Sequence, residues 1–166
     1  MKKILWFLMI VVIIYLGYLD RFLTEGPGNF SIIAYEFADK LTGLLILHTW
    51  FEAGILEKAY LHTYTDFAFM YLYTTLLCLH TRVQAGKEEP SPFASLLKAN
   101  IWLAIIAGIA DLTENMLMLH NFNTFLDRAQ YIPTYFITVS KFVLITWVIT
   151  CFLISLFRTG FSSRKL

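Results

Sequence analysis

The sequence predicts an all-α fold: a polytopic membrane protein with a four-transmembrane-helix bundle and an additional interfacial amphipathic helix. Composition is the first reason, because 58% of the 166 residues are hydrophobic and only 15% are charged, against about 45–50% and about 25% in soluble domains. The second reason is that four long apolar stretches alternate with turn signals. We expect residues 1–166 to form a single membrane domain.

The first span is predicted over residues 4–19, directly after Lys2 and Lys3. A basic start followed by an apolar run is also typical of a signal peptide. No small-x-small cleavage site follows this run, however, and Tyr15 and Tyr18 suit the aromatic belt of a membrane interface. We therefore interpret the stretch as a retained helix, whose modest length local thinning of the bilayer can accommodate.

The amphipathic helix is predicted over residues 31–56, after the Gly-Pro-Gly turn at residues 26–28 and with Asn29 or Ser31 as its N-cap. Its apolar residues recur at three- and four-residue steps, at Ile33, Phe37, Leu41, Leu44, Leu45 and Phe51. Its charged residues make it too polar to cross a bilayer, so we expect it to lie in the interface. The alternative is that residues 44–47 dip into the bilayer.

The second span is predicted over residues 61–79, which are rich in aromatic residues and include Asp66. An exposed loop is expected over residues 81–98, where Ser91 or Ser95 can begin the next helix.

The third and fourth spans are predicted over residues 101–119 and 132–157, joined by a short link at residues 121–131. Pro133 is expected in the first turn of the last helix, where proline is tolerated. Lys141 lies inside that helix.

The distribution of lysine and arginine predicts the orientation, because these residues favour the cytoplasmic side. One side carries Lys2, Lys3, Arg82, Lys87, Lys98, Arg158, Arg164 and Lys165. The other side carries Arg21, Lys40, Lys58 and Arg128. This excess predicts that both termini lie in the cytoplasm.

The sequence gives no reason to expect nucleic-acid binding or a disulfide exchanger. The net charge is only +1, and the two cysteines, Cys78 and Cys151, form no CxxC pair and lie within predicted spans. We interpret them as buried structural thiols. No glycine-rich phosphate loop is present, so the cofactor, if there is one, stays unknown.

A polar cluster is predicted in the outer half of the membrane. At about 1.5 Å per residue, Asp66 and Glu114 lie roughly 7–8 Å below the outer ends of their spans, Asp111 roughly 4–5 Å deeper, and Lys141 roughly 13 Å below the start of the last span. Asp111, Glu114 and Asn115 share one helix face. Small residues on the same helix would let a neighbour approach closely, at Ala104, Ala107 and Gly108.

Charged groups at this depth call for a reason, because each costs about 2.5–3.5 kcal/mol on insertion scales. With one lysine for three acids, the acids must pair, meet water or take up protons. Asp66, Asp111 and Glu114 are therefore candidate catalytic acids or bases. The alternative is that Lys141 forms a buried ion pair that only fixes the register of the helices.

A metal site has weaker support. His62 and Asp66 are four residues apart, a spacing that metal sites use on helices. No second histidine stands at a ligand spacing, so these two residues are weak candidates and no metal is assigned.

The segments GPGNFSIIAYEFA, YTDFAFMYLY, AGIADLTENMLML and SKFVLI resemble an uncharacterised family of small four-span bacterial membrane proteins with a DxxEN motif in the third span. The marks of that family fall here on Glu36, Trp50, Asp66, Asp111, Glu114, Asn115 and Lys141. The resemblance implies a four-span architecture and no particular activity.

The function that we expect is a membrane-embedded polar pocket that binds, and could transform, a small or lipid-like molecule. Lys141 would hold an anionic group or tune a carboxylate, Asn115 would orient a partner, and Glu36 would cover the mouth, with Trp50 as a further ligand-binding candidate. One alternative is an accessory protein whose cluster only fixes helix packing. Another is proton-coupled transport by an oligomer, since four spans without inverted repeats are few for a transporter.

Overall fold

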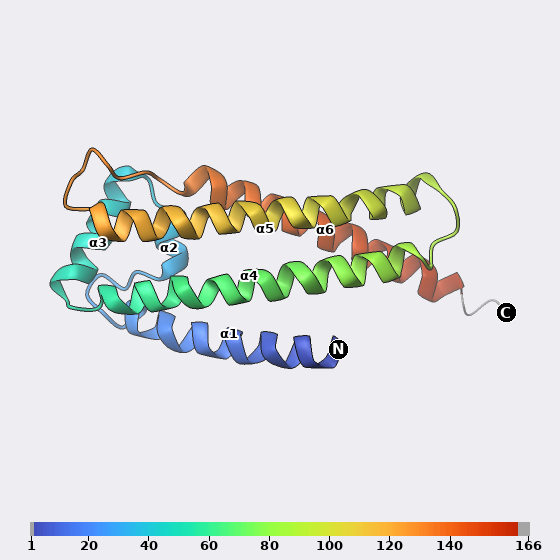
Figure 1. The fold of residues 1–166 in the computed structure, drawn as a ribbon, viewed down its shortest axis with the longest axis horizontal. Coiled ribbons are helices and arrows are strands. Elements are labelled where there is room, and N and C mark those ends of the chain that lie inside the picture. Colours follow the sequence, from blue (N-terminus) through green and yellow to red (C-terminus); the bar gives the residue numbers. More distant parts are fainter. Residues whose placement is uncertain (1, 163–166) are drawn as a thin grey trace.

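The computed structural model describes residues 2–162, and over that range the secondary structure consists of six α-helices. They are α1 (Lys2–Thr24), α2 (Ile32–Glu36), α3 (Lys40–Glu52), α4 (Leu56–Ala85), α5 (Pro92–Thr124) and α6 (Tyr135–Ser162). The predicted all-α class is confirmed. The four long helices lie lengthwise beside one another, with α2 and α3 at one end (Figure 1).

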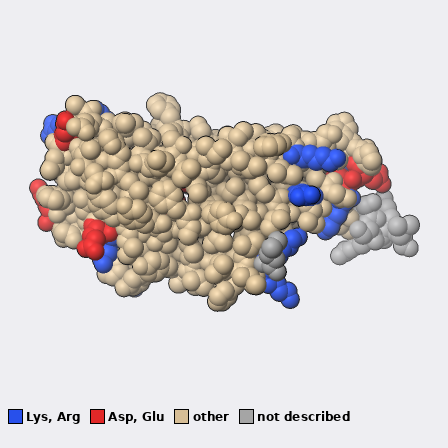
Figure 2. Space-filling model, viewed as in Figure 1, with Lys and Arg blue, Asp and Glu red and all other residues tan. Residues whose placement is uncertain are grey.

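Three helices among the described residues are long and apolar enough to cross a membrane, namely α1, α5 and α6 as far as Gly160. The fourth long helix, α4, has 30 residues but a lower mean hydropathy, because polar residues recur along it. Charged side chains gather at the two ends of the molecule and are nearly absent from the face between them (Figure 2). This distribution is compatible with a membrane protein.

Helix α4 is the element on which the others assemble. It packs against α1, α5 and α6, and α5 also packs against α6. The contact between α4 and α5 is close where small residues lie on α5. Ala104 and Ala107 are fully buried there, and a Cβ added at Gly108 would lie 2.6 Å from Thr74 Oγ1 of α4.

The segment predicted as one helix over residues 31–56 is divided into α2 and α3. Ser31 is the N-cap of α2, and its hydroxyl oxygen accepts a hydrogen bond from Ala34 N at 3.0 Å. Asp39 has an extended backbone and accepts from Thr42 N at 2.8 Å, so it begins a new helix. A side chain that caps the next turn interrupts the preceding helix, which explains why the predicted continuous helix was wrong.

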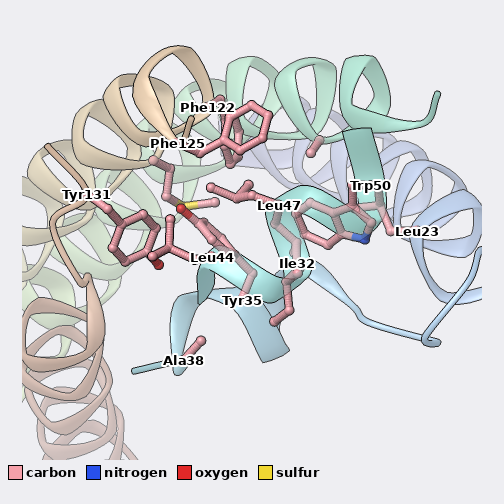
Figure 3. Packing of buried hydrophobic residues seen from close by; sticks show 13 residues of the cluster. Leu23, Ile32, Tyr35, Ala38, Leu44, Leu47, Trp50, Phe122, Phe125 and Tyr131 are labelled. Atoms are coloured by element: carbon pink, nitrogen blue, oxygen red, sulfur yellow. The ribbon is translucent and has the colours of Figure 1, made fainter. Parts of the chain in front are cut away.

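Helix α3 crosses the end of the long helices and closes it with a hydrophobic core (Figure 3). Tyr35, Leu47 and Trp50 are fully buried in that core against Leu23 of α1 and Phe122 of α5. The ring of Tyr35 lies 5.6 Å from that of Trp50 and 5.6 Å from that of Phe122, measured between centroids. This core fixes the position of α2, which carries Glu36.

Other boundaries differ from the prediction in identifiable ways. The loop expected over residues 81–98 is confined to residues 86–91, and Ser91 caps α5 by accepting from Ala94 N at 3.2 Å. Helix α6 begins at Tyr135, so Pro133 precedes the helix instead of lying in its first turn. Thr134 accepts the first helical hydrogen bonds, and it follows the proline that lacks an N–H donor.

Candidate functional site

A buried lysine is the centre of a polar cluster between four helices. Lys141 Nζ on α6 lies 3.0 Å from Asp111 Oδ1 and 3.7 Å from Glu36 Oε2, and it also contacts Glu114 Oε2. All four side chains are at least nine-tenths buried. One ammonium group therefore faces three carboxyl groups, from α2 and α5, in an environment of low dielectric.

Two threonines connect the cluster to α2, namely Thr134 directly before α6 and Thr138 within it. The hydroxyls of Thr134 and Thr138 lie 3.0 and 3.1 Å from the backbone carbonyl oxygen of Glu36. The Thr138 hydroxyl also contacts Glu114 Oε1. The start of α6 therefore holds α2 through both threonines and holds Glu114 through Thr138.

Helix α4 contributes the fourth carboxyl group of the cluster. Asp66 is half-buried, and its Oδ2 atom accepts a hydrogen bond from Asn115 Nδ2 at 2.8 Å. Tyr73, seven residues further along α4, places its phenol beside Asp111. Asn115 lies one helical turn from Asp111 on α5, and the hydrogen bond that its amide donates orients Asp66.

Glu36 belongs to α2, which is too short to cross a membrane, and its acidity is strongly altered. Burial raises the pKa of Glu36 to about 8, and the nearby Lys141 only partly opposes this effect. The neighbouring carboxyl groups of Glu114, Asp66 and Asp111 raise it further. Glu36 therefore changes charge close to neutral pH, where a group can take up or release a proton at little cost.

An elongated groove of about 850 Å³ runs alongside the cluster. Its walls are α1 and α6, its floor is α4, and α2 closes one end. Glu36, Asp66, Asp111 and Lys141 line that end, together with His62. The remaining lining is mostly apolar, and it includes Met9, Ile13, Leu16, Phe69, Leu76, Ile145, Ile149 and Phe152.

Helix α1, one wall of the groove, is held by polar contacts near both of its ends. Trp6 Nε1 donates a hydrogen bond to His80 Nε2 of α4 at 3.1 Å. At the other end, Asp20 Oδ1 accepts from Ile32 N of α2 at 2.8 Å. Between these contacts Gly17 lines the groove, and a Cβ added there would meet nothing within 4 Å.

The structure separates the predicted site residues into three groups. Glu36, Asp66, Asp111 and Lys141 line the groove, while Glu114 and Asn115 lie behind them and do not. Trp50 alone forms the third group, because it is fully buried in the hydrophobic core at the end of the long helices. The candidate ligand-binding role of Trp50 therefore has no contact with the groove to support it.

The weak metal candidates His62 and Asp66 both line the groove. Across the part of the chain that the structure describes, no group of three or more His, Cys, Asp or Glu side chains is arranged to hold a metal ion. His62 is 7% exposed, and its buried Nδ1 atom has no hydrogen-bond partner within the described residues. This nitrogen is a free polar atom at the acidic end of the groove.

Sequence reasoning missed several residues of the groove. Tyr73 lies seven residues after Asp66, a spacing that puts both side chains on one helix face and could have indicated it. Gly17 and Asp20 carried no comparable signal, because their positions depend on how α1 packs against α4. No protein-family model, curated protein or solved structure matches this chain.

Proposed function

We propose that this chain is an integral membrane protein whose groove, with its polar end in the outer half of the bilayer, binds a small or lipid-like molecule and carries acid–base groups able to transform it. One observation carries the proposal: a groove of about 850 Å³ joins apolar walls to the carboxyl groups of Glu36, Asp66 and Asp111. Ligand pockets commonly combine a mainly apolar lining with a few convergent polar groups.

We propose that α4 also crosses the membrane, so that α1, α4, α5 and α6 form four spans. The chain would then belong to the family of small four-span bacterial proteins that carry DxxEN. At about 1.5 Å per residue, the 30 residues of α4 are longer than the hydrocarbon core of a bilayer, which is about 30 Å thick. Large apolar side chains are exposed around the molecule, including Ile14, Trp102, Phe136 and Val143. Patches of that extent are rare on soluble monomers, and contact with lipid accounts for them.

The proposed orientation places both chain ends in the cytoplasm of a bacterial inner membrane. The start of α1, the α4–α5 loop and the end of α6 lie at the same end of the molecule (Figure 1). The basic residues at that end are Lys2, Lys3, Arg82, Lys87, Lys98 and Arg158. Arg164 and Lys165, which belong to the same predicted group, lie outside the described residues.

The proposed chemistry assigns different work to the carboxyl groups. Asp66 and Asp111 line the groove and would contact the ligand, and Glu36 from α2 would exchange protons at its mouth. Glu114 and Asn115 would hold Lys141 and Asp66 in position from behind. Lys141 would set the charge state of the surrounding carboxyl groups.

Recovery of the bound molecule tests this proposal. The full chain is purified in lipid nanodiscs, and the small molecules that copurify are identified by mass spectrometry. We expect a lipid-like species with the wild type that falls at least about tenfold with Asp111→Asn, since the variant removes a buried charge partner. Asp127→Asn, at an exposed position, is the matched control and should retain the species.

A structural role for the cluster is the second candidate, and one observation favours it. Glu114 and Asn115 do not line the groove, and Lys141 is already surrounded by three carboxyl groups. If no molecule copurifies with the wild type and Asp111→Asn only lowers the unfolding temperature, the cluster fixes helix packing and the binding proposal is wrong.

A further inference from the structure

The groove has the shape of a site for a single extended hydrocarbon chain. Its lining on α1 extends from Trp6 to Asp20, which at about 1.5 Å per residue is a length of roughly 21 Å. One leaflet of the hydrocarbon core is about 15 Å thick, so a chain of ordinary membrane length fits along it. Ile13, Phe142 and Leu153 line the groove and are also exposed, so its long side is open between α1 and α6.

The acidic end of this groove has more hydrogen-bond acceptors than donors. Glu36, Asp66 and Asp111 line that end, Glu114 lies behind them, and one lysine serves all four acids. Lys141 already contacts three of the four acids, so its ammonium group is occupied. Asp66 is the most accessible of the four acids. Its Oδ2 atom accepts a hydrogen bond from Asn115, whereas its Oδ1 atom accepts none from the described residues.

His62 gives an independent indication of a ligand at the same place. It lies one helical turn from Asp66 on α4 and lines the groove, and its Nδ1 atom is buried without a partner in the described part of the chain. Buried polar atoms are normally satisfied, so an unpartnered one on a residue that lines the groove indicates a missing donor or acceptor.

We propose that the occupant is a long-chain amphiphile with a protonated amine headgroup, seated between Asp66 and His62 with its chain along α1. This inference rests on the proposed function and names the class of ligand. The ammonium group would supply the second positive charge that the four acids lack. It would donate hydrogen bonds to the Asp66 carboxylate and to the unpartnered ring nitrogen of His62.

A phosphate headgroup does not fit the same chemistry. It would bring further negative charge to a site where carboxyl groups outnumber the lysine, and like charges repel strongly where water is excluded. An uncharged alcohol could donate a hydrogen bond to Asp66, but it would leave the charge of the cluster unchanged. Affinity should therefore fall from the amine to the alcohol to the phosphate.

Binding of three ligands with one chain tests this order. Hexadecylamine, hexadecanol and hexadecyl phosphate are titrated against the full chain in detergent micelles, and bound molecules are counted by native mass spectrometry. We expect one amine per chain, with an affinity at least about tenfold above that of the alcohol, a difference that one charge-assisted hydrogen bond readily provides. This comparison uses the wild type and does not depend on any variant folding.

Variants then locate the site. Asp66→Asn keeps an oxygen for Asn115 and should lower the affinity for the amine at least about tenfold, since the charge is lost. His62→Leu should also lower it. Gly17→Phe should block binding of all three ligands by filling the open groove, whereas Ile14→Phe, at an exposed position outside the lining of the groove, should leave binding unchanged.

The outcomes separate the two proposals. If the phosphate or the alcohol binds as tightly as the amine and Gly17→Phe blocks it, the amine inference is wrong and the proposed binding function stands. If none of the three binds above the level seen with Gly17→Phe, the amine inference is wrong, and the copurification experiment decides the proposed binding function separately. Amine binding that Asp66→Asn leaves intact contradicts the placement of the headgroup and overturns the inference.

Discussion

At the scale of single residues, Lys141 decides whether the buried acids are tolerated. It contacts Asp111, Glu36 and Glu114, and all of them are withdrawn from water. Breaking a buried ion pair by removing one partner typically costs about 3–5 kcal/mol, because the other charge is left uncompensated.

We therefore predict that Lys141→Met lowers the free energy of unfolding by about 3–5 kcal/mol. Thermal unfolding in detergent measures the loss. Lys98→Met, at an exposed position, should change stability by no more than about 0.5 kcal/mol. Adding Glu114→Gln to Lys141→Met should recover part of the loss, and a double variant less stable than the single one would contradict this account.

Glu36 predicts how stability depends on pH. Burial raises the pKa of Glu36 from 4.5 to about 8, so between these values the folded chain holds a proton that the unfolded chain releases. The contribution of this proton to the free energy of unfolding is present in full below pH 4.5 and is lost as the pH rises toward about 8. The groups that face Glu36 are Lys141, Glu114, Asp66 and Asp111.

Glu36→Gln should accordingly reduce the loss of stability with rising pH, because the amide does not titrate. Unfolding temperatures of the wild type and the variant, measured at several pH values between about 5 and 8, test this expectation. Equal slopes for the two proteins would mean that Glu36 keeps an ordinary pKa in the folded chain.

At the scale of elements, the close contact of α4 with α5 sets the position of the whole cluster. A side chain at Gly108 would collide with Thr74, whereas one at Gly17 would enter open space. Gly108→Leu should therefore destabilise the fold by about 1–3 kcal/mol, the usual cost of overpacking.

Gly17→Leu is the matched control for that prediction, since it adds the same side chain to a glycine of another long helix. Replacing glycine in a helix interior is favourable by itself, so this variant should be as stable as the wild type or slightly more stable. Similar losses for both variants in thermal unfolding would show that the α4–α5 contact is looser than described.

Helix class and helix number within the long apolar stretches could be predicted from the sequence, but the division of residues 31–56 could not. Apolar residues continue at helical spacing through Phe37 and Leu41, so periodicity alone favours one helix. The cap at Asp39 interrupts it. A single aspartate in an apolar pattern fits a cap or an exposed helical position equally well, and tertiary packing decides between them.

The residues of the cluster were predictable to a similar extent. The spacing of Asp111, Glu114 and Asn115 indicates one shared face. It does not tell which of them faces a groove, because that depends on the rotation of α5 against α4 and α6. Trp50 shows the same limit, since an aromatic residue near a helix end suits an interface, a ligand or a core, and here it lies in the core.

At the scale of the whole molecule, the proposed four spans predict which ends face which side. A cysteine at Glu89, in the α4–α5 loop, should react with a membrane-impermeant maleimide only in inverted vesicles. A cysteine at Asp127, at the opposite end, should react in intact cells. Both native cysteines, Cys78 and Cys151, are at least partly buried and provide a low background.

Labelling of both engineered positions from the same side would contradict the crossing of α5. A reporter fused after Leu166 tests the remaining prediction, and activity on the external face would reverse the proposed orientation. The groove itself could not be predicted at this scale, because α1 and α6 are distant in sequence and become its two walls through the packing of α1 against α4 and of α6 against α4 and α5.

The two polar contacts that hold α1 also determine how wide a molecule the groove can admit. Trp6 anchors one end of α1 to His80, and Asp20 anchors the other end to Ile32. The two ends of α1 are therefore fixed relative to α4 and α2. Extra width comes from bending of the middle of α1, where Met9 and Ile13 line the groove between the two contacts. A bulky group is therefore accommodated most easily halfway along the chain of a ligand, and least easily at its two ends.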